Sequence, residues 1–324
     1  MLQGYAIEDG RLLRLAEPLA VLERAVWIDL IDPSEEEEDA VETALAIGVP
    51  TRAEMEEIEE SSRFYREGGA AYMTADLLAR ADTDDPVLAP VTFILAGQRL
   101  VTLRYHEPQA FHSFAQRAER QELGCGDGTS TLLSLLEVVV DRQADILEGV
   151  GRAIDKVSRA VFRVPGGADG RGGDDFQEVL RRIGRLGAVV TAVSDSLASL
   201  ERVVVFLTVA TGARPSDKEG RLRLKTLGRD ARDLTGHAGG QTQKLNFLLD
   251  ATLGMISIEQ NKIIKIFSVA AVVFLPPTLI ASIYGMNFEV MPELGWAFGY
   301  PFAIGLMVLS AVLSYWIFKT RGWL

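Results

Sequence analysis

Several features are scarce or missing in this 324-residue sequence. It holds one cysteine, Cys125, so no disulfide can form within the chain, which fits a reducing compartment. Acidic residues outnumber basic ones by 45 to 33, and the formal net charge of -12 argues against a nucleic-acid partner. The first fifteen residues lack both a basic segment and an apolar run, so we expect no cleavable signal peptide.

Sequence motifs of enzymes are also missing. The glycine-rich stretch 164–175 reads VPGGADGRGGDD and lacks the Gly-Lys-Ser/Thr ending of a phosphate-binding loop, so it predicts a turn. The sequence contains no recognisable nucleophile–base pair and no metal-hydrolase motif. We therefore expect a protein that is not an enzyme and that uses no organic cofactor.

Two long uncharged runs lie near the C-terminal end. Ile266–Ile283 and Pro301–Phe318 each contain eighteen residues without a charged side chain. As helices they would each cover about 27 Å, close to the roughly 30 Å of a hydrocarbon core. The runs favour two membrane spans over two buried helices of a soluble domain.

Charges beside these runs predict their orientation. Lys262 and Lys265 precede the first run, and Lys319 and Arg321 follow the second. The connecting loop 288–300 has no Lys or Arg. The acidic residues of this loop are Glu289 and Glu293. By the positive-inside rule, both termini lie in the cytoplasm and the loop lies outside.

The first 125 residues predict an α/β domain. Apolar runs of strand type occur at 3–8, 24–31, 70–79, 90–97 and 99–105, and the last two are joined by a tight turn at Gly97-Gln98. A helix is expected to start after Ser34, with Glu37 at capping-box spacing. The acidic run that follows Ser34 is either this helix start or, alternatively, a metal-binding segment.

Residues 126–262 predict long helices. Stretches 130–163 and 174–211 form an expected helical hairpin, and another helix is expected to run from about residue 216 through the first span. Some seventy residues of helix would reach about 105 Å, which predicts a stalk. The expected division is therefore an α/β domain at 1–125, a hairpin and stalk at 126–262, and a two-helix membrane domain at 263–324.

One stripe of the expected stalk and first span is small or polar. Steps of four and three residues, the 3.5-residue period of helices around a common axis, define a seam. Its members are Asp250, Gly254, Ser257, Asn261, Ile264, Ser268, Ala271, Leu275, Thr278, Ser282 and Gly285. The polar side chains within the span all fall on it. The seam is either a helix–helix contact or the wall of a water-filled pore, and a pore would require a ring of subunits.

The residue types near the spans limit which ion such a pore could pass. The three histidines and the cysteine lie elsewhere in the sequence, so imidazole and thiolate ligands for soft metals are missing. Amide, hydroxyl and carbonyl oxygens remain, and hard divalent cations suit them. Asn287 could hold a hydrated Mg²⁺ by accepting hydrogen bonds from its waters.

Several segments resemble one known family. YGMNFEVMPELGWAFGYP (Tyr284–Pro301), IEQNKIIKIFSVAAVVFLPPTLIASIYGMN (Ile258–Asn287), the ending FKTRGWL and VWIDLIDPSEEE (Val26–Glu37) resemble the CorA family of magnesium transport proteins. The Met-Pro-Glu-Leu segment (Met291–Leu294) is more similar to its magnesium/cobalt branch than to its zinc branch. The resemblance covers essentially the whole chain.

This resemblance implies a funnel-shaped homopentamer in a bacterial inner membrane that passes Mg²⁺, Co²⁺ and Ni²⁺. Its cytoplasmic part would be an α/β/α domain followed by a long helical stalk. The resemblance also implies a filter at Gly285, Met286 and Asn287, and pore-lining positions along the seam, with Asp250 close to the ion. It further implies that cytoplasmic Mg²⁺ bound between subunits closes the channel. The candidate regulatory carboxylates are Asp82, Asp84, Asp85, Asp230 and Asp233. The alternatives are a zinc transporter of the same fold, with or without proton coupling, and a membrane-anchored ion sensor without transport.

Overall fold

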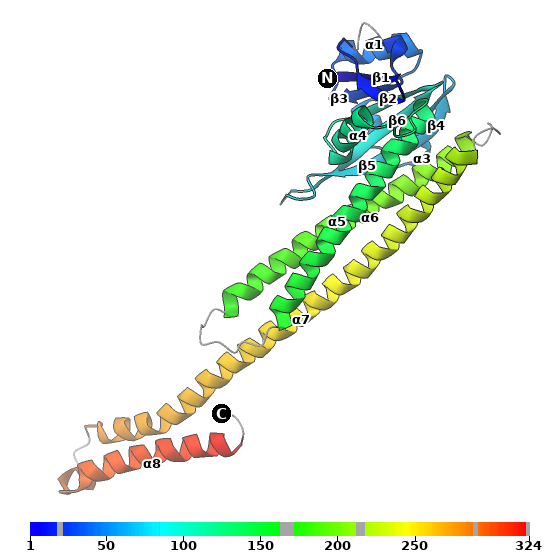
Figure 1. Ribbon diagram of the computed structural model, residues 1–324. Helices are drawn as coiled ribbons and strands as arrows, with labels where there is room; N and C mark the ends of the chain where they lie inside the picture. Colours follow the sequence, from blue (N-terminus) through cyan, green and yellow to red (C-terminus); the bar gives the residue numbers. More distant parts are fainter. Residues whose placement is uncertain (18–21, 84, 163–171, 212–217, 288–290, 322–324) are drawn as a thin grey trace. The chain divides into compact units, whose positions relative to one another are not determined.

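The computed structural model describes residues 1–17, 22–83, 85–162, 172–211, 218–287 and 291–321 (Figure 1). Asp84, Glu289 and most of the predicted turn at 164–175 lie outside these ranges. Contacts divide the chain into two units. The first comprises Met1–Gly170 and Gln177–Leu249, and the second comprises Arg171–Phe176 and Asp250–Leu324.

A seven-stranded sheet forms the N-terminal part of the first unit. Strand β3 pairs in parallel with β7, and the other neighbouring strands pair antiparallel. The predicted hairpin between β6 and β7 is confirmed, with Gly97 at a φ of 63° that favours glycine. In spatial order the strands are β2 (Arg11–Arg14), β1 (Leu2–Glu8), β3 (Trp27–Ile31), β7 (Arg99–Arg104), β6 (Val87–Ala96), β5 (Ala70–Ala79) and β4 (Phe64–Glu67).

Helices cover both faces of this sheet. Side chains alternate along β3, so Trp27 packs with Phe114 of helix α4 in one core while Ile28 joins Val41 of helix α1 in the other. The expected α/β/α arrangement is therefore confirmed. The helices of this part are α1 (Glu35–Leu45), α2 (Arg52–Met55), α3 (Glu60–Arg63) and α4 (Gln109–Arg120).

Helix α1 starts as the sequence predicts. Ser34 is its N-cap, and the side chains of Ser34 and Glu37 form the reciprocal bonds of a capping box. The carboxylate of Glu37 also accepts from the backbone N–H of Leu2 and lies 2.9 Å from the amino group of Met1. Burial acts to raise the pKa of Glu37, but these hydrogen bonds lower it overall. The acidic run thus serves as a helix start that also fixes strand β1.

Three long helices follow, close to the predicted ranges. They are α5 (Gly128–Phe162), α6 (Gly172–Thr211) and α7 (Lys218–Tyr284). Within the first unit, polar contacts join them: Gln143 of α5 donates to Ser196 of α6 at 3.1 Å, and Arg223 of α7 pairs with Glu137 of α5 at 2.8 Å. Apolar side chains from all three helices join the sheet core.

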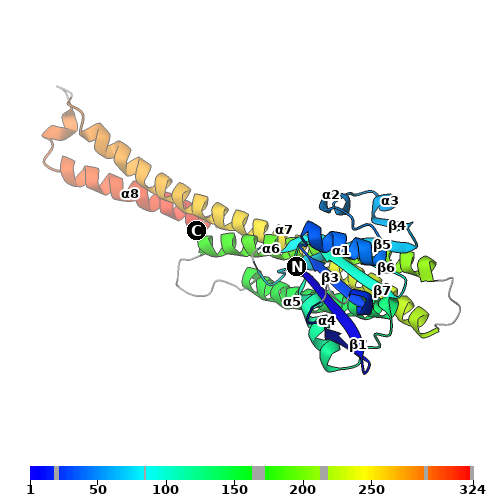
Figure 2. The same cartoon turned by 90° about the horizontal axis from the view of Figure 1, so that it is seen from above.

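The second unit contains the end of α7 and one more helix. A 3-10 turn η2 (Pro292–Gly295) leads into helix α8 (Gly299–Thr320). Two views show α8 lying alongside the last part of α7 (Figures 1 and 2). The chain therefore ends in a helical hairpin formed by its two uncharged runs.

A buried polar network joins strands β3 and β7. Arg104 donates to Asp29 at 2.9 Å, and both side chains are almost fully buried, with 7% and 3% of their surface exposed. Thr102 donates to the same carboxylate at 2.7 Å and accepts from the indole N–H of Trp27 at 3.0 Å. The Trp-Ile-Asp segment thus fixes the one parallel strand pair in the described sheet.

Replacing Arg104 should destabilise the sheet strongly. Arg104→Met leaves the Asp29 carboxylate buried without its partner, so we expect the free energy of unfolding to fall by about 3–5 kcal/mol. Denaturant unfolding of the full chain in detergent, followed by circular dichroism, measures the change.

Two further variants serve as controls. Arg24→Met removes an exposed ion pair with Glu8 in the same region and should change stability by less than about 1 kcal/mol. The double variant Asp29→Leu/Arg104→Met should recover much of the loss. Equal effects of Arg24→Met and Arg104→Met would contradict the assignment of the buried pair.

Candidate ion pathway

Helices α7 and α8 are long and apolar enough to cross a membrane. Within the most apolar eighteen residues of each helix, only 6% of positions are buried. Phe274 and Leu279, for example, are exposed. Helices of a soluble core are mostly buried, so this exposure argues against the alternative of two core helices and is consistent with a lipid surround.

Helix α7 continues through two consecutive prolines. Pro276 and Pro277 have no N–H to donate to the carbonyls of Val272 and Val273, four residues earlier. The hydroxyl of Thr278 adds a side-chain bond beside this break by donating to the carbonyl of Phe274 at 2.7 Å. Because a hydroxyl oxygen has two lone pairs, Thr278 can still accept a hydrogen bond from an ion's water.

The seam is exposed along its whole length, from Asp250 to Gly285. The buried or half-buried positions of the span lie on the other side of α7, as at Val269, Val273 and Ile280, and Ala303 of α8 is buried too. At 100° per residue, these positions are centred roughly opposite the seam. Packing within the hairpin therefore leaves the seam free for another copy of the chain or for water.

Two members of the seam are large and apolar. Ile264 and Leu275 expose 61% and 65% of their surfaces, whereas Ser268 and Ala271 between them are small. Repeated around an axis, such apolar side chains would form narrow rings from which water withdraws. Nearer the start of the second unit, Ser257 donates to the carbonyl of Leu253, and Asp250 and Asn261 are exposed.

The Gly-Met-Asn segment follows the last turn of α7. The N–H of Gly285 donates to Ala281 at 3.0 Å, and that of Met286 donates to Ile283 at 3.2 Å. A Cβ at Gly285 would lie 3.2 Å from the carbonyl oxygen of Ala281, so glycine fits this helix end best. Asn287 is exposed, and its amide can both donate and accept hydrogen bonds.

Candidate regulatory carboxylates in the first unit already have cationic neighbours. Asp82, in the turn between β5 and β6, pairs with Arg142 at 2.6 Å, and Asp85 pairs with Arg80 at 3.2 Å. Asp230 lies 3.8 Å from Arg229, and Asp233 is exposed. Among the described residues no group of three or more His, Cys, Asp or Glu side chains is arranged to hold a metal ion.

Further acidic residues of α5 lie near the stalk and were not predicted from the sequence. Glu137, Asp141 and Asp145 recur every four residues, so they share one side of α5. Partial burial raises the pKa of Asp141, and the charges of Asp145, Glu137 and Asp230 raise it further against the opposing effect of Arg117. The four-residue spacing was the signal that could have revealed this group.

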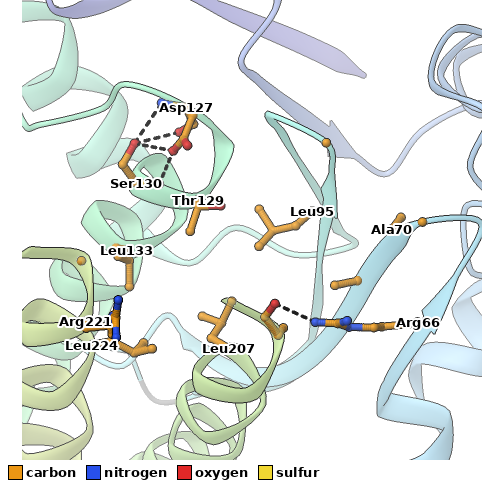
Figure 3. Close-up of a pocket in the computed structure, with 15 residues that line it drawn as sticks. Arg66, Ala70, Leu95, Asp127, Thr129, Ser130, Leu133, Leu207, Arg221 and Leu224 are labelled. Carbon is orange, nitrogen blue, oxygen red and sulfur yellow. Dashed lines mark hydrogen bonds between the residues drawn. The ribbon is translucent and has the colours of Figure 1, made fainter. Parts of the chain in front are cut away.

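A cavity of about 430 Å³ lies elsewhere in the first unit (Figure 3). Leu95, Leu133 and Leu207 form its apolar wall, and Arg66 and Arg221 bring positive charge to it. Asp127 also lines it, but Ser130 donates to this carboxylate through both its backbone N–H and its hydroxyl. The cavity thus offers a poor environment for a divalent cation, and no predicted site residue is among those that line it.

Comparisons with known proteins agree along the whole chain. Residues 23–320 match the family described as CorA-like Mg²⁺ transporter protein. Proteins named Magnesium transport protein CorA from Pasteurella multocida and Escherichia coli K12 are 39% and 38% identical to this chain over 325 residues. Each alignment covers 100% of this chain and 100% of the relative. The complete structure of the CorA magnesium transporter from Methanocaldococcus jannaschii aligns with a TM-score of 0.75 at 20% identity, covering 100% of this chain and 99% of that one.

The two sides of the first span should differ in access to water. In a Cys125→Ala background, Ser268→Cys and Thr278→Cys place thiols on the seam, while Val269→Cys and Ile280→Cys place them on the side that packs within the hairpin. A small, water-soluble cationic thiol reagent should modify the seam thiols much faster, because thiolates form and react in water and not in lipid. Mass spectrometry of the protein in liposomes measures the rates. Equal modification of both sides would exclude a water-filled seam.

Proposed function

This chain belongs to the family of CorA-like Mg²⁺ transporter proteins, and on that premise we propose that it conducts Mg²⁺ through a pore made by several copies of itself. The observation that carries the proposal is the exposed small and polar seam of α7, roughly opposite the side that packs within the hairpin. Proteins of this family are ion transporters, so the chain is not an enzyme.

The need for several copies follows from the chemistry of the span. Ser268 and Thr278 would be costly if they faced lipid tails, because hydrocarbon forms no hydrogen bonds. Two helices cannot enclose a water-filled path, whereas a closed ring of identical subunits can. The family resemblance implies five subunits, and a homopentamer embedded in lipid is the assembly that we propose.

The proposed ion path presents oxygen atoms to its cargo. The filter is Gly285, Met286 and Asn287, where a ring of Asn287 amides accepts hydrogen bonds from the water shell of Mg²⁺. Magnesium gives up its waters reluctantly, so binding through these waters suits it. Below the filter, the hydroxyls of Thr278 and Ser282 continue the polar wall, and Leu275 forms an apolar ring. Co²⁺ and Ni²⁺, with similar hydrated shells, are expected to pass as well.

Two acidic surfaces of the first unit are suited to regulation by internal Mg²⁺. Asp82 is bonded to Arg142, and Asp230 acts electrostatically on Asp141, the residue before Arg142 on α5. Adjacent helix residues point about 100° apart, so Asp82, beside Arg142, and Asp230, beside Asp141, approach different sides of α5. A site that uses both would therefore form between subunits, where repulsion between like charges favours a divalent cation. Binding of Mg²⁺ there would favour the closed, symmetric ring.

Transport in purified form tests the proposal. Liposomes that contain only this protein should take up Mg²⁺, and also Co²⁺ and Ni²⁺, without a pH gradient. Asn287→Ala should abolish uptake, because the filter loses its acceptor for the hydrated ion, while gel filtration shows an unchanged assembly. Wild-type uptake by Asn287→Ala would remove the amide from the mechanism.

The same liposomes separate the alternatives. Uptake of Zn²⁺ that depends on a pH gradient would indicate a zinc transporter of the same fold. Protection from protease by divalent ions without any uptake would indicate a sensor. A matched control is Asn246→Ala, which removes an exposed amide from the part of α7 in the first unit and should leave uptake unchanged.

The proposed orientation places the protein in the bacterial inner membrane with both termini in the cytoplasm. In a Cys125→Ala background, Glu293→Cys should react with a membrane-impermeant thiol reagent added to spheroplasts, because the loop 288–300 lies outside. Ser113→Cys, on helix α4 of the first unit, should react only after lysis. The reverse pattern would overturn the orientation.

A further inference from the structure

The ion pair between Asp82 and Arg142 is asymmetric. Arg142 Nη2 donates to Asp82 Oδ2 at 2.6 Å, across sixty residues of sequence. The arginine side chain is packed into the surface of α5 with 27% of its area exposed, whereas the aspartate side chain is 79% exposed. The cation is therefore largely shielded from water, and much of the carboxylate remains open to solvent.

The neighbouring pair between Arg80 and Asp85 differs. Its atoms lie 3.2 Å apart, and both side chains are well exposed. Exposed pairs of this kind exchange readily with water and contribute little. Arg142 is thus the more buried of the two cations at this turn.

We propose that Arg142 sets the internal Mg²⁺ concentration at which the pore closes, by occupying Asp82 until Mg²⁺ displaces it. This inference rests on the proposed function, in which Asp82 contributes to the regulatory site between subunits. Arg142 touches neither the pore nor, in the proposed site, the ion itself. Arg142 instead determines how sensitive closure of the pore is to internal Mg²⁺.

Two electrostatic effects give this role its direction. A Mg²⁺ ion that binds Asp82 must break the bond to Arg142 and leave a partly buried guanidinium without that partner. The same guanidinium, a few ångströms from the carboxylate, repels the incoming dication. Both effects weaken binding of Mg²⁺ to the closed ring, and by linkage they favour the open state.

Removing the guanidinium should therefore increase sensitivity to Mg²⁺. Arg142→Gln should lower the internal Mg²⁺ concentration for half-maximal inhibition by about two- to fivefold, the range expected for one partly exposed ion pair. Arg142→Met, which keeps the packed aliphatic stem, should behave in the same way. Arg142→Lys keeps the charge and should stay close to wild type.

Two measurements report the shift independently. One is Co²⁺ flux from liposomes in which the Mg²⁺ concentration is varied on the side of the membrane that carries the first unit. The other is the Mg²⁺ concentration that half-protects the assembled protein from limited proteolysis, which needs no conduction. Arg152→Gln is the matched control, because Arg152 lies on the same helix and forms an exposed pair with Glu148 at 3.4 Å. It should leave both midpoints unchanged.

A double-variant cycle separates this inference from the proposed function. Asp82→Asn should raise both midpoints, and Arg142→Gln added to it should lower them by much less than it does alone, because the bond to Asp82 is already lost and only the repulsion of the dication remains. Suppose that Asp82→Asn raises the midpoints, but that Arg142→Gln and Arg142→Met assemble normally and leave the midpoints unchanged or raised. The regulatory site at Asp82 would then stand, and the proposed role of Arg142 would be wrong. If Asp82→Asn has no effect, the regulatory site at Asp82 is wrong and this inference fails with it.

Discussion

Hydrocarbon cannot form hydrogen bonds, and this constraint governs how the C-terminal part of the chain is built. Helix α7 remains helical through Pro276 and Pro277, with the Thr278 hydroxyl bonded to its own backbone beside them. The polar groups of the span are gathered on one stripe, and α8 packs away from it. A single chain therefore leaves this stripe exposed. In the proposed function a ring of chains would cover it, and assembly and ion path would both follow from the same constraint.

Burial decides what an aspartate–arginine pair does in this protein. Asp29 and Arg104 are both removed from water, so each depends on the other and the pair fixes strand register. Asp82 and Arg142 form a contact that is even shorter, at 2.6 Å against 2.9 Å, but the carboxylate faces solvent. An exposed carboxylate can exchange one cation for another at small cost. The same pair of residue types is thus structural within the sheet and suited to exchange at the turn between β5 and β6.

Local signals in the sequence predicted most of the fold. The capping box at Ser34, the turn at Gly97 and the long apolar periodicities of α5 to α7 each depend on residues close in sequence, and each is found in the structure. Strands β2 and β4, with four residues each, are too short for a periodic signal, and α4 was also missed. The bond from Arg142 to Asp82 spans sixty residues, so no local pattern encodes it. The seam was visible as a period, but its role stays a proposal because its positions are exposed in the single chain.

The distribution of oxygen types along the chain matches two different demands on Mg²⁺ in the proposed function. An ion that must pass quickly should be held weakly, and the residues from Ile266 to Asn287 offer only neutral amide, hydroxyl and carbonyl oxygens. A regulatory ion, whose binding signals the internal Mg²⁺ concentration, should be bound more tightly, and carboxylates in the first unit attract it more strongly. Charged groups in the span would slow conduction, and neutral groups in the sensor would bind too weakly to compete with Arg142. Placing the carboxylates outside the span, joined to it by one continuous helix, allows both demands to be met by a single chain.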